Sequence, residues 1–207
     1  GSVSIIGAVS PPGSDFSEPV TQYTRQYTRI FWSLDKTLAS ARHFPSINWL
    51  NSNSEYIGSV SDWWQKETGF DWRRLRAKAM ELLTEQDHLN QIVRLVGPDA
   101  LPDGQRLILL TADLLTTGFL QQNALDEVDT YSSPQKQIRM LDIILRFYEG
   151  AERIIKRGAV IQAFYELPIV HSLLTMKNQI HNDQIEKFDS LITDLDHQLA
   201  ALEEKYV

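Results

Sequence analysis

The sequence predicts a mainly α-helical protein, a helical bundle preceded by a short strand and a linker. Apolar residues recur at three-and-four spacing over most of residues 71–205, which is the period of a helix with one buried face. Proline and glycine stand mostly at the ends of those segments. Only residues 3–6, Val-Ser-Ile-Ile, resemble a strand, and a lone short strand has no partner to pair with.

The first residues look like the end of another domain. Gly1-Ser2 has the form of a cloning scar, and the strand at 3–6 is best explained as the last strand of a missing β-rich domain. Pro11-Pro12-Gly13-Ser14 then forms a linker or turn. We therefore divide the chain into residues 1–16, which hold the scar, the terminal strand and the linker, and residues 17–207, which form a helical domain.

The first helical segment of that domain extends to about residue 41. Ser17 is the expected N-cap, and Pro19 follows near the first helical position, where its missing N–H costs nothing. The pattern breaks near Ser33-Leu34-Asp35. Asp35 is therefore placed to cap a second, short helix.

Two further helical segments follow. Residues 54–68 are expected to form a helix that ends at Gly69. Residues 71–96 have a helical apolar period and a polar stretch at 84–88, which predicts two helices divided around that stretch. The apolar positions are Leu75, Ala79, Leu82, Leu83, Leu89, Ile92 and Val96.

The second half of the chain continues the bundle. Residues 97–104 hold two prolines and two glycines and predict a sharp turn before a helix at 105–120. Pro134 opens a long amphipathic helix that Gly158 ends. Residues 160–180 are expected to be helical with a bend at Pro168.

The last predicted helix, residues 183–205, carries a short coiled-coil seam. The seam consists of Phe188, Ile192, Leu195, Leu199 and Leu202. Fewer than three heptads make a weak dimer, so we expect the seam to pack on the preceding helices of the same bundle rather than to form an intermolecular zipper.

Composition excludes several classes of function. The chain has 20 Lys and Arg against 27 Asp and Glu, and the net charge of −7 argues against non-specific binding to nucleic acid or anionic membranes as the main activity. No apolar run approaches the length of a membrane span. The absence of cysteine excludes disulfides and thiolate zinc sites.

Motifs for chemistry are scarce. The sequence has no G-x-x-x-x-G-K-[ST] to hold the β- and γ-phosphates, no H-E-x-x-H and no G-x-S-x-G, and its five histidines are scattered. Asp126, Glu127 and Asp129 suggest a divalent-ion site, but capping or solvation of the turn before the Pro134 helix is the favoured interpretation. Trp63-Trp64 and Trp72 suggest an aromatic binding surface, although aromatics near helix ends more often belong to the core.

Two segments without regular periodicity carry aromatic and amide groups, which is typical of functional loops. They are Arg42-His43-Phe44-Pro45-Ser46-Ile47-Asn48-Trp49 and Phe119-Leu120-Gln121-Gln122-Asn123-Ala124-Leu125-Asp126-Glu127-Val128-Asp129-Thr130-Tyr131. Further motifs are Gly7-Ala8-Val9-Ser10-Pro11-Pro12-Gly13, Asp15-Phe16-Ser17-Glu18-Pro19-Val20-Thr21, Phe31-Trp32, Ile92-Val93-Arg94-Leu95-Val96-Gly97-Pro98-Asp99-Ala100-Leu101-Pro102, Glu166-Leu167-Pro168 and Met176-Lys177. Together they closely resemble the helical C-terminal domain that follows the nucleotide-binding domain in the catalytic A subunit of V-type and archaeal-type rotary ATPases. The His43-Phe44-Pro45-Ser46-Ile47-Asn48 run resembles the catalytic subunit rather than its non-catalytic B partner.

The resemblance implies an adenine pocket. In that family an aromatic residue at the Phe44 position and another at the Leu125 position pack against the adenine ring, and Pro45 and Phe119 line the same pocket. An aromatic wall contributes roughly 1–3 kcal/mol per base through stacking. This chain departs from the family at Leu125, where Phe is usual, and at Ser14, where Gly is usual.

The resemblance also implies a contact with the rotating central stalk through the turn at 97–104. The contact residues are Asp99, Ala100, Leu101, Pro102 and Asp103. The two aspartates make the turn acidic, which suits a basic shaft.

The implied protein is the catalytic subunit of a V-type ATPase or ATP synthase, which couples ATP hydrolysis or synthesis to H⁺ or Na⁺ transport. Its implied partners are B subunits, central-stalk subunits and ATP or ADP with Mg²⁺ in the full protein, in the cytoplasmic head peripheral to the membrane. For this chain alone we expect no cofactor, metal or catalytic residue, no ATPase activity and a monomer. Two alternatives stay open, a free-standing helical interaction module and a helical enzyme of unknown type.

Overall fold

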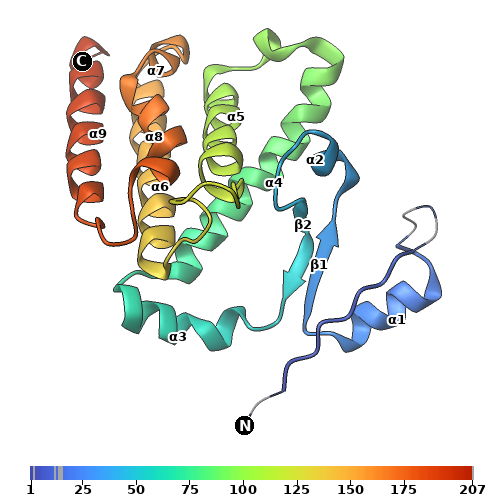
Figure 1. Ribbon diagram of the computed structural model, residues 1–207. Coiled ribbons are helices and arrows are strands. Elements are labelled where there is room, and N and C mark those ends of the chain that lie inside the picture. Colours follow the sequence, from blue (N-terminus) through green and yellow to red (C-terminus); the bar gives the residue numbers. More distant parts are fainter. Residues whose placement is uncertain (2, 12, 14–15, 207) are drawn as a thin grey trace.

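The protein is described by a computed structural model that covers residues 1, 3–11, 13 and 16–206 (Figure 1). The predicted fold class is confirmed, because helices dominate and the described residues contain a single two-stranded sheet. Ser14, the second departure from the family, lies outside the described residues. Among the described residues, no helix combines the length and the apolar composition needed to cross a membrane.

The helical bundle extends from residue 57 to residue 203. Its helices are α3 (Ile57–Thr68), α4 (Trp72–Val96), α5 (Asp103–Leu115), α6 (Pro134–Ile155), α7 (Gln162–Tyr165), α8 (Pro168–Gln179) and α9 (Lys187–Glu203). In Figure 1, α9, α6, α8 and α5 stand side by side and α4 crosses them obliquely. Helix α6 is central, since it contacts α3, α4, α5, α8 and α9.

The core of the bundle is built around α6. Pro134 occupies the first turn of this helix, as the sequence predicts, and the structure adds that Ser133 caps it by accepting from the Lys136 N–H. Phe147 of α6 is fully buried and meets Phe164 of α7 edge to face, with ring centroids 6.5 Å apart. Phe188, at the start of the predicted seam on α9, is also fully buried. Each such side chain stabilises the bundle by roughly 1.5–3 kcal/mol relative to an exposed one.

The seam on α9 packs inside the bundle, as predicted. Leu195, Leu199 and Leu202 are buried, and α9 contacts α6 and α8. The tryptophans also follow the core interpretation, because Trp64 and Trp72 stack with centroids 5.6 Å apart and pack against the core. Trp63 remains 49% exposed.

The expected division of residues 71–96 is wrong, since α4 is one continuous helix. The polar stretch at 84–88 contains no glycine or proline, and the Thr84 hydroxyl bonds back to the Met80 carbonyl inside the helix. A helix needs only one apolar face, so a polar stretch on the other face does not interrupt it. The apolar stripe does end early, because Ile92 and Val96 are 44% and 60% exposed.

The helical segment expected from 20 to 41, with a break near residues 33–35, is only partly confirmed, because a strand lies between two short helices. Helix α1 (Pro19–Tyr27) is followed by strand β1 (Ile30–Leu34), and α2 (Lys36–Ser40) precedes strand β2 (Ile47–Ser54). β1 pairs with β2 in antiparallel register, Ile30 opposite Ser54 and Leu34 opposite Ile47, with an irregularity between Phe31 and Ser33. β-Branched and aromatic residues favour strands where a partner is available, and β2 supplies it.

Of the other predictions for this part of the chain, the N-cap at Ser17 and the strand at 3–6 are wrong, and the end of α3 at Gly69 is confirmed. The N-cap of α1 is Glu18, whose carboxylate accepts from the Thr21 N–H, and not Ser17. Residues 3–6 form no strand. Gly69 does end α3, in the left-handed conformation that glycine favours. Helix α1 lies on the side of the hairpin away from the bundle (Figure 1).

Candidate functional site

The structure brings together the two irregular segments that the sequence singles out. A π-helical turn (Thr116–Leu120) continues α5, closed by the Gln121 N–H donating to the Thr116 carbonyl. The next residue, Gln122, donates its N–H to the Phe44 carbonyl at 2.7 Å. The Gln121 side-chain amide donates to the Arg42 carbonyl at 3.3 Å. Two hydrogen bonds therefore join segments that are far apart in the sequence, 79 positions in the case of Arg42 and Gln121.

The Phe44 loop, residues 41–46, turns sharply between α2 and β2. Arg42 has a positive φ of 57°, and the Phe44–Pro45 peptide bond is cis. The His43 N–H donates to the Leu38 carbonyl, and the His43 ring lies 5.5 Å from the Trp49 ring. Burial, and then the neighbouring Lys177 charge, lower the pKa of His43. The Phe44 side chain is 52% exposed and Pro45 is exposed, so both are open to contact from outside this chain.

Asp35 fixes the start of this loop, in the capping role that the sequence predicts. Its carboxylate accepts from the Thr37 hydroxyl, the Asn48 side-chain amide, and the Thr37 and Leu38 N–H groups. Hydrogen bonds from the Thr37 and Asn48 side chains lower the pKa of Asp35 to about 2. One carboxylate thus joins the N-terminus of α2 to strand β2.

The acidic residues of the segment before α6 form a turn. Asp126 accepts from the Val128 and Asp129 N–H groups, which is the capping role favoured above. The Asp129 N–H is the largest cause of the lowered pKa of Asp126, followed by the Asn178 side chain. No group of three metal-ligating side chains occurs within the described ranges. Leu125, at the tip of this turn, is 96% exposed.

Two lysines lie beneath this turn, Lys136, which none of the sequence motifs includes, and Lys177, which belongs to the Met176-Lys177 motif but was given no role. Lys136 is fully buried and Lys177 is 8% exposed. Burial is the main cause of the lowered pKa of each lysine, and Asp129 and Asp126 oppose it. The sequence carried a signal for the position of these lysines. Lys136 precedes Met140 by four residues and Lys177 follows Leu173 by four, so each lysine shares a helix face with an apolar residue that is buried.

Phe119 has a different environment from Phe44. It lines a cavity of about 320 Å³ between the hairpin and helices α4 and α5. Trp32 and Trp49 come from the hairpin, and Trp72 comes from α4. Phe44, Pro45 and Leu125 do not line this cavity, so the adenine pocket predicted for these four residues stays a prediction.

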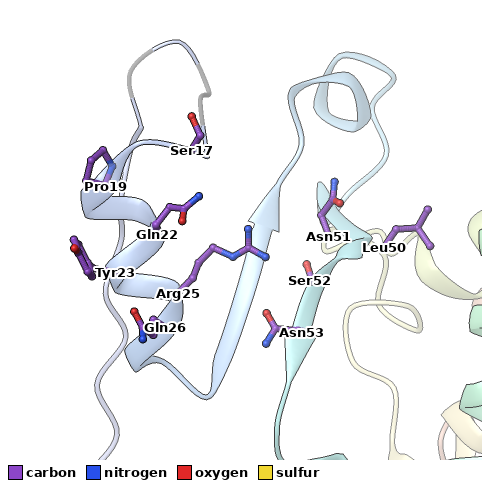
Figure 2. Close-up of a pocket in the computed structure, with 10 residues that line it drawn as sticks. All are labelled: Ser17, Pro19, Gln22, Tyr23, Arg25, Gln26, Leu50, Asn51, Ser52 and Asn53. Carbon is purple, nitrogen blue, oxygen red and sulfur yellow. The ribbon is translucent and has the colours of Figure 1, made fainter.

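A second hollow, of about 820 Å³, separates α1 from β2. Its lining is mostly polar, and Figure 2 shows the Arg25 side chain extending from α1 toward the hairpin. The Arg25 guanidinium lies 4.8 Å from the centre of the Phe31 ring, a cation–π contact between α1 and β1.

The predicted stalk-contact residues lie at the corner between α4 and α5. Asp99 and Ala100 belong to a short 3₁₀ turn and are exposed, as is Pro102. Leu101 is buried, and Asp103 accepts from the Ile161 N–H at 3.2 Å, so both point into the fold.

The same corner is more apolar than the acidic turn alone suggests. Leu95 is 86% exposed and Val96 is 60% exposed, directly before the turn. The Asp99 carboxylate lies 3.8 Å from the Arg106 guanidinium, and this pair contributes little stability because Asp99 is exposed to solvent.

Two known families match this chain. The family described as "C-terminal domain of V and A type ATP synthase" matches residues 61–165, about half of the chain. The family described as "ATP synthase alpha/beta family, nucleotide-binding domain" matches residues 1–54. The first match covers α4, α5 and α6, and the second covers α1 and the hairpin.

Curated relatives match along the entire chain. The V-type ATP synthase alpha chain of Halothermothrix orenii is 50% identical over 206 residues, which is 100% of this chain and 35% of the relative. The A subunit of the A-type ATP synthase of Thermococcus onnurineus is 48% identical with the same coverage. That of Methanopyrus kandleri is 48% identical over 99% of this chain and 35% of its own length. The chain thus spans about a third of the length of these relatives.

A solved structure shares the fold. The structure of a unique ATP synthase subunit, NeqB, from Nanoarcheaum equitans, matches with a TM-score of 0.55 and 22% identity. The match covers 67% of this chain and 34% of that one.

Proposed function

The chain belongs to the family of C-terminal domains of V and A type ATP synthases, and we propose that it serves the catalytic A subunit of such an enzyme as one wall of the adenine pocket. The full protein would hydrolyse or synthesise ATP with Mg²⁺ and couple that reaction to transport of H⁺ or Na⁺. Its partners would be B subunits and central-stalk subunits, in a cytoplasmic head at the membrane. Our division of the chain at residue 17 stays a prediction, and the two family matches suggest a second boundary between residues 54 and 61.

The observation that carries the proposal is the hydrogen bond from Gln122 to the Phe44 carbonyl. It holds an exposed aromatic ring beside the turn that contains Leu125, and both side chains are accessible. Stacking on a purine requires an accessible aromatic face and no particular base edge. We propose that Phe44 and Pro45 form the wall against the ring, with Leu125 adding dispersion contacts and Phe119 supporting the segment from inside.

Steady-state kinetics of the reconstituted complex test this proposal. Phe44→Ala should raise the KM for ATP, at a cost of roughly 1–3 kcal/mol in kcat/KM, because it removes the aromatic wall. Leu125→Phe should lower KM by a smaller amount, since it restores a ring at a fully open position. Tyr165→Ala, which removes a 44% exposed aromatic from α7, is the matched control. An unchanged KM in a folded Phe44→Ala complex would show that the loop is structural.

We also propose that the corner between α4 and α5 contacts the central stalk. The exposed Asp99, Ala100 and Pro102 would meet it directly, while Leu101 and Asp103 hold the turn on the bundle. Leu95 and Val96 add an apolar surface to the acidic turn. Exposed apolar side chains grouped at one corner are typical of an interaction surface.

A further inference from the structure

Three charged side chains lie buried together beneath the Phe44 loop and the turn before α6. Lys136 is 0% exposed, Asp129 3% and Lys177 8%. They come from three different places, the N-terminal turn of α6, the preceding turn, and the C-terminal turn of α8. Burying charges is expensive, and apolar side chains of similar size often stabilise a fold as well or better. Their burial therefore indicates that they hold neighbouring main-chain segments in position.

The lysines bind main-chain carbonyl groups. Lys177 Nζ donates to the Thr117 carbonyl at 2.8 Å and to the Gln121 carbonyl at 2.5 Å, and lies 3.9 Å from Asp129 Oδ2. Lys136 Nζ donates to the Lys177 carbonyl at 2.7 Å. One ammonium group therefore ties both ends of the π-helical turn to α8, and the other ties α8 to α6.

Asp129 holds the far side of the same segment. Its carboxylate accepts from the Asn123 N–H at 2.7 Å, and its carbonyl accepts from the Gln122 side-chain amide at 2.8 Å. Residues 121, 122 and 123 are thus each bound by a member of the charged group. The bonds at Gln121 and Asn123 are charge-assisted, and such hydrogen bonds are stronger than neutral ones.

The fixed segment in turn holds the Phe44 loop. Gln121, whose carbonyl is bound by Lys177, donates its side-chain amide to the Arg42 carbonyl, and Gln122 donates its N–H to the Phe44 carbonyl. We propose that Lys177, supported by Lys136 and Asp129, is a positioning residue that sets the place of the Phe44 loop through the main chain of residues 121–123. Its relevance to nucleotide binding rests on the proposed function, whereas the positioning itself does not.

Hydrogen exchange of the Gln122 amide in this 207-residue chain, resolved by NMR, tests the positioning. Lys177→Met removes the ammonium group and keeps most of the side-chain volume. We expect exchange at Gln122 to accelerate by about tenfold or more, while buried amides such as those of Leu114 and Ile144 change by less than about threefold. Lys187→Met removes an exposed lysine that donates to Gln184, and serves as the matched control.

Two results would overturn the proposal. Unchanged exchange at Gln122 would show that the segment needs no ammonium group, and equal acceleration across the bundle would show a merely structural role. If Lys177→Met does not fold, Asp129→Asn provides the same test, because it removes the charge and keeps an oxygen for the Asn123 N–H. A local, smaller acceleration at Gln122 is then expected.

Kinetics of the assembled complex separate this proposal from the adenine pocket. With both correct, Lys177→Met raises the KM for ATP in the same direction as Phe44→Ala and leaves kcat nearly unchanged. If Lys177→Met accelerates exchange at Gln122 but Phe44→Ala leaves KM unchanged, the positioning stands and the adenine pocket fails. If Phe44→Ala raises KM while Gln122 stays protected in Lys177→Met, the pocket stands and the positioning is wrong.

Discussion

The bundle and the first 54 residues differ in the kind of side chain that they bury. In the bundle, large apolar side chains such as Phe147, Phe164 and Phe188 are fully buried. Among the described residues up to 54, the only buried ones are polar, Thr21 and Ser33, while Trp32 and Leu34 of β1 are 62% and 73% exposed.

This contrast separates two sources of stability. The bundle has a contiguous apolar core, which is the main driving force for folding. The hairpin depends on polar anchors such as Asp35, on strand pairing and on contact between β2 and α4. The Phe44 loop belongs to the second region but is held by the first, through Gln121 and Gln122.

The largest expected effect tests this contrast with one type of substitution in each region. Phe147→Ala should lower the free energy of unfolding by roughly 3–5 kcal/mol, because it leaves a cavity in the core. Phe31→Ala in β1 removes a partly buried ring whose contacts include Phe16 and Arg25, and should cost only about 1 kcal/mol. Urea unfolding followed by circular dichroism measures both. Equal losses would mean that the hairpin shares the core of the bundle.

The sequence predicts most of the bundle because its signals are local. Pro134 marks the start of α6, and Gly69 marks the end of α3. The α9 seam follows from its spacing. The sequence predicts a break at the polar stretch of α4 and the structure has none, because periodicity does not distinguish a solvent-facing stretch from an interruption.

What the sequence does not predict depends on distant partners. β1 forms where a helix was expected because it pairs with β2 across the Phe44 loop. The roles of Lys136 and Lys177 depend on carbonyl groups of another segment, so their position on an apolar face was the available signal. The two irregular segments were recognised, and their contact was implied only by the resemblance. The positions of Phe44, Pro45 and Leu125 around adenine stay a prediction.

A smaller effect concerns how tightly the bundle holds the segment behind the loop. A Cβ at Gly118, in the π-helical turn, would lie 2.8 Å from the Leu173 main-chain oxygen of α8. A Cβ at Gly150 of α6 would meet only the end of the Leu199 side chain, which is able to rotate away. Gly118→Ala should therefore cost roughly 1–3 kcal/mol of unfolding free energy, and Gly150→Ala less. Thermal unfolding of the two variants measures this difference. A smaller loss of stability in Gly118→Ala than in Gly150→Ala would mean that α8 shifts to accommodate the added methyl group.

The smallest expected effect concerns the polar anchor of the hairpin and depends on pH. The pKa of Asp35 is about 2 in the folded chain and 3.8 without its partners, so the folded state favours the carboxylate. The stability that it contributes is fully present above pH 3.8 and is lost as the pH falls through about 2. Because Asp35 is only partly buried and solvent screens its charge, we expect less than about 1 kcal/mol.

Asp35→Asn is the matched control, because asparagine caps helices nearly as well as aspartate but does not titrate in this range. NMR signals of the Thr37 and Asn48 amides report the local structure, since both donate to Asp35. The wild-type chain should lose these ordered signals relative to the variant between about pH 4 and pH 2, whereas the other carboxylates titrate in both chains. A difference that stays constant across this window would show that the amide suffices as the anchor. The hairpin would then be held by hydrogen bonding alone and not by the charge of Asp35.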